Sequence, residues 1–144
     1  MRNDDDVVGT IRQVLAELAP RLSGKPSSAV TEALTSATEA SLRMQGYRVF
    51  REWNIAVPWG RGRLDLAALP TNCADRRIAI ELDRSNKQRS IKKLSLLAQG
   101  GQLALWIRWG HRLPSREGEV VPASITVIEV PLWFRRAPLP PPVP

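Results

Sequence analysis

The sequence predicts one α/β domain in which a mixed five-stranded sheet is flanked by helices. Two N-terminal segments carry apolar residues at every third or fourth position, which is typical of helices that bury one side. The next three segments alternate apolar and polar residues, which is typical of strands. A basic helical segment and two further strands follow, so the predicted order is α-α-β-β-β-α-β-β.

The length and composition favour a single folded unit. The chain has 144 residues, of which 43% are hydrophobic and 24% are charged. These values are typical of one globular domain rather than of a disordered chain. We predict a domain over residues 1–136, with its core at about 28–130 and an N-terminal helix at about 4–19. Residues 137–144 are proline-rich and predict an extended tail.

The first two helices have recognisable starts and stops. Three aspartates, Asp4 to Asp6, suit the N-terminus of the first helix, and Pro20 is expected to end it. Ser27 or Ser28 is expected to cap the second helix, which runs to about Gln45 before Gly46. Its apolar stripe consists of Val30, Ala33, Leu34, Ala37, Ala40 and Met44.

The remaining elements follow from period-two runs and turn residues. Strands are predicted at 47–57, 63–69, 77–83, 102–109 and 124–130, with a turn at 58–62 and a helix at 86–99. Three strands in succession, then a helix and more strands, indicate a mixed sheet. Large aromatic side chains usually bury, and we expect this of Trp53, Trp106, Trp109 and Trp133.

The charge of the chain favours a polyanionic partner. The formal net charge is +7, and arginine outnumbers lysine by 17 to 4. Guanidinium groups bind phosphate oxygens in a bidentate way, so a small arginine-rich domain suits nucleic acid. A GC-rich coding sequence is an alternative cause of this arginine content, and composition alone does not decide between the two.

The N-terminus and the single cysteine bear on compartment. Residues 1–10 lack the basic and then apolar layout of a signal peptide, and no apolar run is long enough to span a membrane. Cys73 is the only cysteine, so the chain forms no internal disulfide. We therefore expect a cytoplasmic protein without a membrane association.

Acidic residues stand out in two neighbouring strands. Alternation places Glu81 and Asp83 on one face of their strand, and it places Asp65 on the face of its strand opposite to Leu64 and Leu66. If the strands pair as a meander, Asp65 meets Glu81. Carboxylates this close repel each other unless a cation lies between them, which predicts a divalent metal. Polar edge positions paired with nearby arginines would also explain the pattern.

The layout of helix, strand with Asp, strand with Glu and basic helix resembles the PD-(D/E)XK nuclease superfamily. The resemblance covers roughly residues 28–130 and implies a restriction-endonuclease-like fold. It also implies Mg²⁺ or Mn²⁺ bound by Asp65, Glu81 and the carbonyl of Leu82. Asp83 would support this set or hold a second ion, and Glu39 would contribute from the preceding helix.

The superfamily's lysine would stand at position 83, where this chain has an aspartate. In some branches the lysine lies on the following helix, where Lys87, Lys92 and Lys93 are available. Lys87 is nearest to the strand end, and we predict that it positions or deprotonates the attacking water.

Basic residues near the acidic strands are candidates for nucleic-acid contact. A base could also stack on the tryptophan of the predicted turn. The candidates are Trp59, Arg61, Arg63, Arg84, Lys87, Arg89, Lys92 and Lys93. A solvated basic face and an incidentally exposed tryptophan remain alternatives.

Together these features predict a metal-dependent endonuclease that hydrolyses phosphodiester bonds in DNA. A catalytically inactive relative that binds DNA as a subunit or regulator is the alternative, and a protein-interaction module is a third hypothesis. A homodimer would suit cleavage of both strands, because one domain of this size covers little of a duplex.

Overall fold

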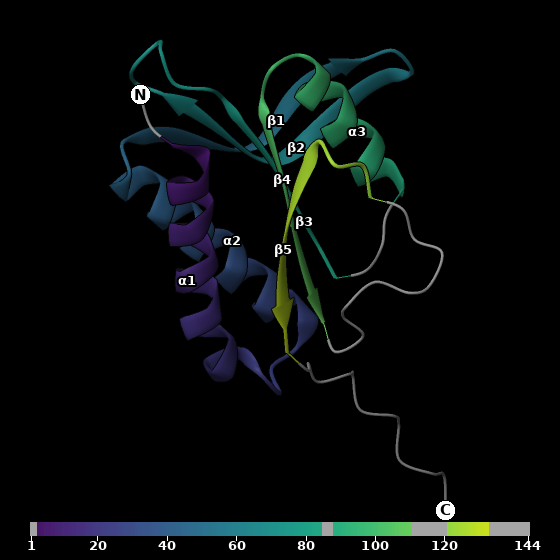
Figure 1. Cartoon of the computed structure of the whole chain (residues 1–144). Helices are drawn as coiled ribbons and strands as arrows, with labels where there is room; N and C mark the ends of the chain where they lie inside the picture. Colours follow the sequence, from purple (N-terminus) through teal and green to yellow (C-terminus); the bar gives the residue numbers. More distant parts are fainter. Residues whose placement is uncertain (1–2, 85–87, 111–120, 133–144) are drawn as a thin grey trace, which may run out of the picture.

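The computed structural model describes residues 3–84, 88–110 and 121–132, which hold three helices and one five-stranded sheet (Figure 1). The helices are α1 (Asp4–Leu22), α2 (Ser27–Met44) and α3 (Gln88–Gln99). The strands are β1 (Tyr47–Val57), β2 (Gly60–Pro70), β3 (Ile78–Asp83), β4 (Leu103–Gly110) and β5 (Ile125–Pro131).

The sheet is mixed, as the order of elements predicted. Its strands are arranged β1-β2-β3-β4-β5. The first three form an antiparallel meander, whereas β3, β4 and β5 are parallel. The parallel step from β3 to β4 is made through α3, because parallel neighbours need a crossover connection.

Helices cover both faces of the sheet. Figure 1 shows α1 and α2 on one side and α3 on the other. The larger cluster of buried apolar side chains lies under α1 and α2, and it includes Leu34, Leu66, Ile80 and Leu105. A smaller cluster lies under α3 and is built around Leu94 and Trp106. Trp106 and Trp109 are buried as predicted, Trp53 is half-buried, and Trp133 lies outside the described residues.

The first helix differs from prediction at its C-terminus. The Asn3 side chain caps α1 by accepting a hydrogen bond from the Asp5 amide at 2.9 Å. The helix then continues through Pro20 to Leu22, so the expectation that Pro20 ends it was wrong. A proline removes one N–H donor, but in the last turn the Ser23 amide still donates to the Ala19 carbonyl at 3.2 Å.

The second helix begins without a serine cap. Pro26 is the N-cap residue and Ser27 is already helical, so neither predicted serine has the capping position. Met44 is 90% exposed and Ala40 is also exposed, so the apolar stripe is shorter than predicted. Gly46 does end the helix as expected, with a φ of 94° that favours glycine.

The β1–β2 hairpin is longer and tighter than predicted. Its turn contains only Pro58 and Trp59, and β2 begins at Gly60 rather than after residue 62. Gly60 has a φ of 133°, a conformation that side chains rarely allow. Because β3 pairs with β2 only from Leu66 to Ala68, the tip of the hairpin projects past β3 as a two-stranded arm.

Strands β3, β4 and β5 agree with the predicted ranges to within one residue at each end. In the part of the chain that the structure describes, no helix combines the length and the apolar character that crossing a membrane requires.

Candidate metal and nucleic-acid site

Asp65 and Glu81 meet where β2 and β3 part. The backbone pairing of the two strands runs to Leu66 opposite Ile80, and Asp65 and Glu81 are the next residues along. Beyond that point, hydrogen bonds between side chains and backbone amides join the two strands in place of backbone pairs. The Asp65 amide donates to Oε2 of Glu81 at 3.1 Å, and the Leu82 amide donates to Oδ2 of Asp65 at 2.8 Å. The predicted meeting of these two residues is confirmed.

A local break in strand alternation accompanies this exchange. Leu64 packs in the cluster under α3, whereas Leu66 packs in the cluster under α1 and α2. The prediction that both leucines share one face was therefore wrong. The register of β1 and β2 skips Glu52 and Asp65 between the pairs Arg51–Leu66 and Trp53–Leu64, and Glu52 has a φ of 50°, a strained value for a residue other than glycine. The break lets the Asp65 side chain turn toward the backbone of β3.

Glu81 is a buried acid, and its surroundings disfavour the ionised form. Its side chain is only 3% exposed. Burial, followed by the hydrogen bond and charge of Asp65, raises the pKa of Glu81 to about 8, while the Lys93 ammonium acts in the opposite direction. A cation between these two carboxylates would therefore stabilise their ionised forms.

Lys93 supplies a cation from α3. Its ammonium pairs with Oε1 of Glu81 and donates to the carbonyl of Arg63 at 2.8 Å. Oε1 accepts no regular hydrogen bond among the described residues, and the Lys93 ammonium is its charged neighbour there. The site therefore joins three elements, namely β2, β3 and α3.

The lysine at the carboxylates is not the one chosen from the sequence. Lys87 lies outside the described residues, so its predicted role stays a prediction. A helical projection at about 100° per residue places Lys93 on a flank of α3, between the buried side and the solvent. The same projection turns the exposed Lys92 away from the sheet. This signal could have favoured Lys93 over Lys92 before the fold was known.

Asp83 is buried near the pair but is held by other partners. Its Oδ2 accepts hydrogen bonds from the Ser90 hydroxyl at 2.6 Å and from the Trp106 indole N–H at 2.8 Å. These bonds orient the carboxylate toward α3 and β4. Asp83 is therefore close to Glu81 in the sequence but makes a separate set of contacts.

Glu39 lies in a network on the face covered by α2. Arg51 donates from Nε to Oε1 of Glu39 at 2.7 Å, and Arg43 donates to Oε2 at 3.0 Å. The hydrogen bond from Arg51 lowers the pKa of Glu39 and also that of Glu32. In the register Arg51 lies opposite Leu66, whose side chain packs under α1 and α2. Glu39 is therefore not brought together with Asp65 and Glu81.

The basic candidates lie on the hairpin arm and at the start of α3. Trp59, at the tip of the arm, is 57% exposed. All the other described basic candidates except Lys93 are exposed, namely Arg61, Arg63, Arg84, Arg89 and Lys92. The bond from Lys93 to the Arg63 carbonyl joins the base of the arm to α3 beside the carboxylates.

The chemistry of the pair fits a small hard cation. Mg²⁺ prefers oxygen ligands and is usually held through one or two carboxylates. Asp65 and Glu81 provide two carboxylates, one of which has a buried oxygen that already contacts a cation. Among the described residues no group of three or more Asp, Glu, His or Cys side chains could hold a metal. A metal would therefore depend on these two side chains and on the Leu82 carbonyl that the resemblance implies.

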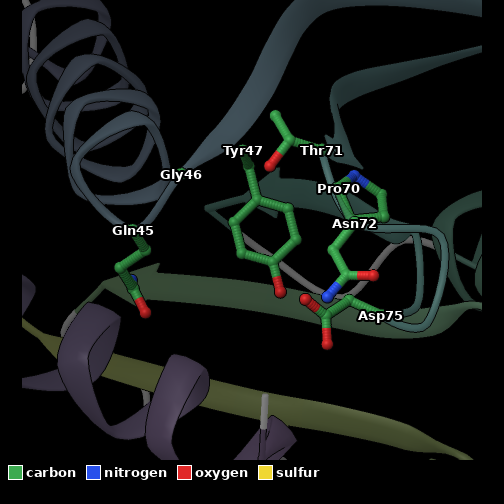
Figure 2. A pocket seen from close by; sticks show the side chains of 7 residues that line it. All are labelled: Gln45, Gly46, Tyr47, Pro70, Thr71, Asn72 and Asp75. Carbon is green, nitrogen blue, oxygen red and sulfur yellow. The ribbon is translucent and has the colours of Figure 1, made fainter. Parts of the chain in front are cut away.

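A separate pocket of about 250 Å³ lies at the far end of β1 and β2, where the register pairs Tyr47 with Pro70. Figure 2 shows the Tyr47 hydroxyl, the Asn72 amide and the Asp75 carboxylate directed toward one another. None of the predicted site residues lines this pocket.

Comparisons of this chain with protein-family models, with curated proteins and with solved structures found no match.

Proposed function

We propose that this protein is a metal-dependent endonuclease that hydrolyses phosphodiester bonds in DNA, built on a restriction-endonuclease-like fold of the PD-(D/E)XK type. One observation carries the proposal. Asp65 and Glu81 exchange side-chain bonds with the backbone where β2 and β3 part, and a lysine contacts the same glutamate. Asp65 of β2, Glu81 of β3 and Lys93 of α3 therefore meet at one point.

In the proposed reaction Asp65 and Glu81 would hold the metal, together with the carbonyl of Leu82. Bound Mg²⁺ or Mn²⁺ would promote ionisation of water and stabilise charge on the phosphate. The Lys93 ammonium, already beside Glu81, would orient the attacking water by donating a hydrogen bond to it from Nζ. Lys93 thereby takes the role that the sequence assigned to Lys87.

The DNA would lie across the start of α3 and the hairpin arm. Arg84 follows β3, Arg89 and Lys92 lie on α3, and Arg61 and Arg63 lie on β2, and all five are exposed. Arginine and lysine contacts to phosphates position a duplex without reading its sequence. Trp59 at the tip of the arm offers an aromatic face on which an unpaired base could stack.

The test is cleavage of supercoiled, linear, branched and single-stranded DNA with Mg²⁺ or Mn²⁺. Wild type is compared with Asp65→Ala and Glu81→Ala, and with Glu17→Ala, which removes an exposed acid on α1. We expect metal-dependent cutting that both site variants abolish and the control retains. Cutting that survives both substitutions would overturn the proposed site.

An inactive DNA-binding relative is the second candidate, and one observation favours it. The Lys93 ammonium already contacts the buried oxygen of Glu81, where a metal would also bind. In that case no substrate would be cut with either metal, and DNA would still bind with a steep dependence on salt concentration.

A further inference from the structure

The clamp formed by Asp83, Ser90 and Trp106 lies beside the carboxylate pair and fastens three elements together. Asp83 ends β3, Ser90 lies in the first turn of α3, and Trp106 lies in the middle of β4. Both hydrogen bonds end on the same oxygen of Asp83, at 2.6 and 2.8 Å.

The clamp is buried, so its polar groups depend on one another. Asp83 is 6% exposed, Ser90 is 4% exposed and Trp106 is fully buried. A buried polar group that loses its partner costs about 1–3 kcal/mol. The guanidinium carbon of Arg108 lies 4.9 Å from the centroid of the Trp106 ring and so packs against the indole. The indole is thereby held in position to donate to Asp83.

Ser90 and Lys93 are three residues apart on α3, and such residues are neighbours on a helix surface. Fixing Ser90 to the end of β3 therefore sets the rotation and the position of the turn that carries Lys93. From that turn the side chain contacts both Glu81 and the Arg63 carbonyl. A lysine stem is long and flexible, so the position of its ammonium depends on where its helix is held.

We propose that Asp83 is a positioning residue that fixes α3 through Ser90 and Trp106, so that Lys93 stands at Glu81. Asp83 occupies the strand position at which the PD-(D/E)XK superfamily carries its lysine. In the proposed nuclease the lysine lies on α3 instead, as Lys93, and the aspartate at the strand position holds that helix in place. This inference rests on the proposed function for the role of Lys93, but the clamp itself can be tested without activity.

Two variants separate positioning from metal binding. Asp83→Asn retains an oxygen acceptor, and Ser90→Ala removes only the hydroxyl that ties α3 to β3. Ser95→Ala, on the same helix and outside the clamp, is the matched control. We expect Ser90→Ala to lower kcat by about 10- to 100-fold with little change in KM for DNA, whereas Ser95→Ala cleaves as wild type does.

Binding of Mn²⁺ measured by calorimetry tests whether Asp83 is a ligand. Asp83→Asn is expected to bind Mn²⁺ as wild type does, while Asp65→Asn and Glu81→Gln lose the site. Loss of Mn²⁺ in Asp83→Asn would make Asp83 a ligand and overturn its positioning role.

A readout independent of cleavage follows Lys93 itself. The chain has four lysines, so the NMR spectrum of protein labelled with ¹³C-lysine contains four Cε signals. The signal that is missing from the spectrum of Lys93→Arg belongs to Lys93. We expect that signal to shift in Ser90→Ala as it does in Glu81→Gln, and to stay unchanged in Ser95→Ala. An unchanged signal in Ser90→Ala would overturn the clamp. A wild type that cuts no DNA would refute the nuclease proposal and leave this measurement to decide the clamp.

Discussion

Glu81 is an acid whose folded environment stabilises its protonated form. The protonated carboxyl avoids both the cost of burying a charge and the repulsion of Asp65, and these effects together raise its pKa to about 8. The Lys93 ammonium offsets them only in part. At the scale of single residues, this conflict marks the position as more than a packing site.

The stability of the metal-free protein should depend on pH through Glu81. Between about pH 4.3 and about pH 8, the folded state keeps a proton that the unfolded chain has released. The free energy of unfolding therefore falls as the pH rises through this window, by at most about 1.4 kcal/mol per pH unit. The contribution is fully present below the window and lost above it.

Glu81→Gln should remove this dependence, because its amide does not titrate. We expect urea unfolding in EDTA, from about pH 5 to about pH 8, to show wild type losing stability relative to the variant. Glu17→Gln, which changes an exposed acid, should show no such trend. A constant difference between wild type and Glu81→Gln at every pH would mean that Glu81 ionises like an ordinary glutamate.

Lys93→Ala should slow cleavage by about 10²- to 10⁴-fold and leave the affinity for DNA nearly unchanged. The reason is that its ammonium lies on the Glu81 carboxylate rather than on the exposed basic surface. Lys25→Ala, an exposed lysine between α1 and α2, is the control. If Lys87→Ala abolishes cutting while Lys93→Ala does not, the original assignment to Lys87 is the correct one.

At the scale of elements, α3 links the site to the core. Its buried residues Ile91 and Leu94 pack on the sheet together with Leu97 and Ala98. Its polar flank carries Ser90 and Lys93 to the ends of β2 and β3. The packing of one helix therefore controls whether three side chains of the site meet.

Leu94→Ala should destabilise the fold by about 2–5 kcal/mol, because Leu94 is fully buried under α3. Met44→Ala is the matched control: Met44 is 90% exposed, so its truncation should change stability by less than about 0.5 kcal/mol. Urea titrations of both variants measure these values. Equal effects would contradict the burial of Leu94.

At the scale of the whole molecule, the residues predicted to contact DNA lie on the projecting hairpin and around the start of α3. The net charge is +7, and the exposed basic candidates gather on the hairpin arm and the start of α3. The opposite face is covered by α1 and α2, where Arg51 is already engaged with Glu32 and Glu39. The proposed function predicts that a polyanion contacts the α3 side through these candidates.

DNA affinity should fall with salt, and the hairpin arm should account for part of the slope. We expect Arg61→Ala with Arg63→Ala to weaken binding across all DNA sequences. The slope of log K against log salt concentration should decrease by about 1 for each lost phosphate contact. Arg21→Ala on α1 should leave both unchanged. An unaltered slope in the double variant would place the DNA elsewhere.

The sequence by itself determined the order of elements, the mixed sheet and the meeting of Asp65 with Glu81. Each depends on periodicity or on neighbouring strands, which are local properties of the chain. It missed the break in alternation at Asp65, because a positive φ at Glu52 has no signature in a non-glycine residue. It also misjudged Pro20, because the surrounding helix tolerates one missing donor.

Only the tertiary structure decided which lysine contacts Glu81 and which partners hold Asp83. The helical projection separates Lys93 from Lys92, but only the packing of α3 against the sheet brings the Lys93 ammonium to Glu81. Asp83 and Glu81 share a strand face by alternation, yet Asp83 accepts hydrogen bonds from Ser90 of α3 and Trp106 of β4. Such assignments depend on contacts between segments far apart in the chain, which no local pattern contains.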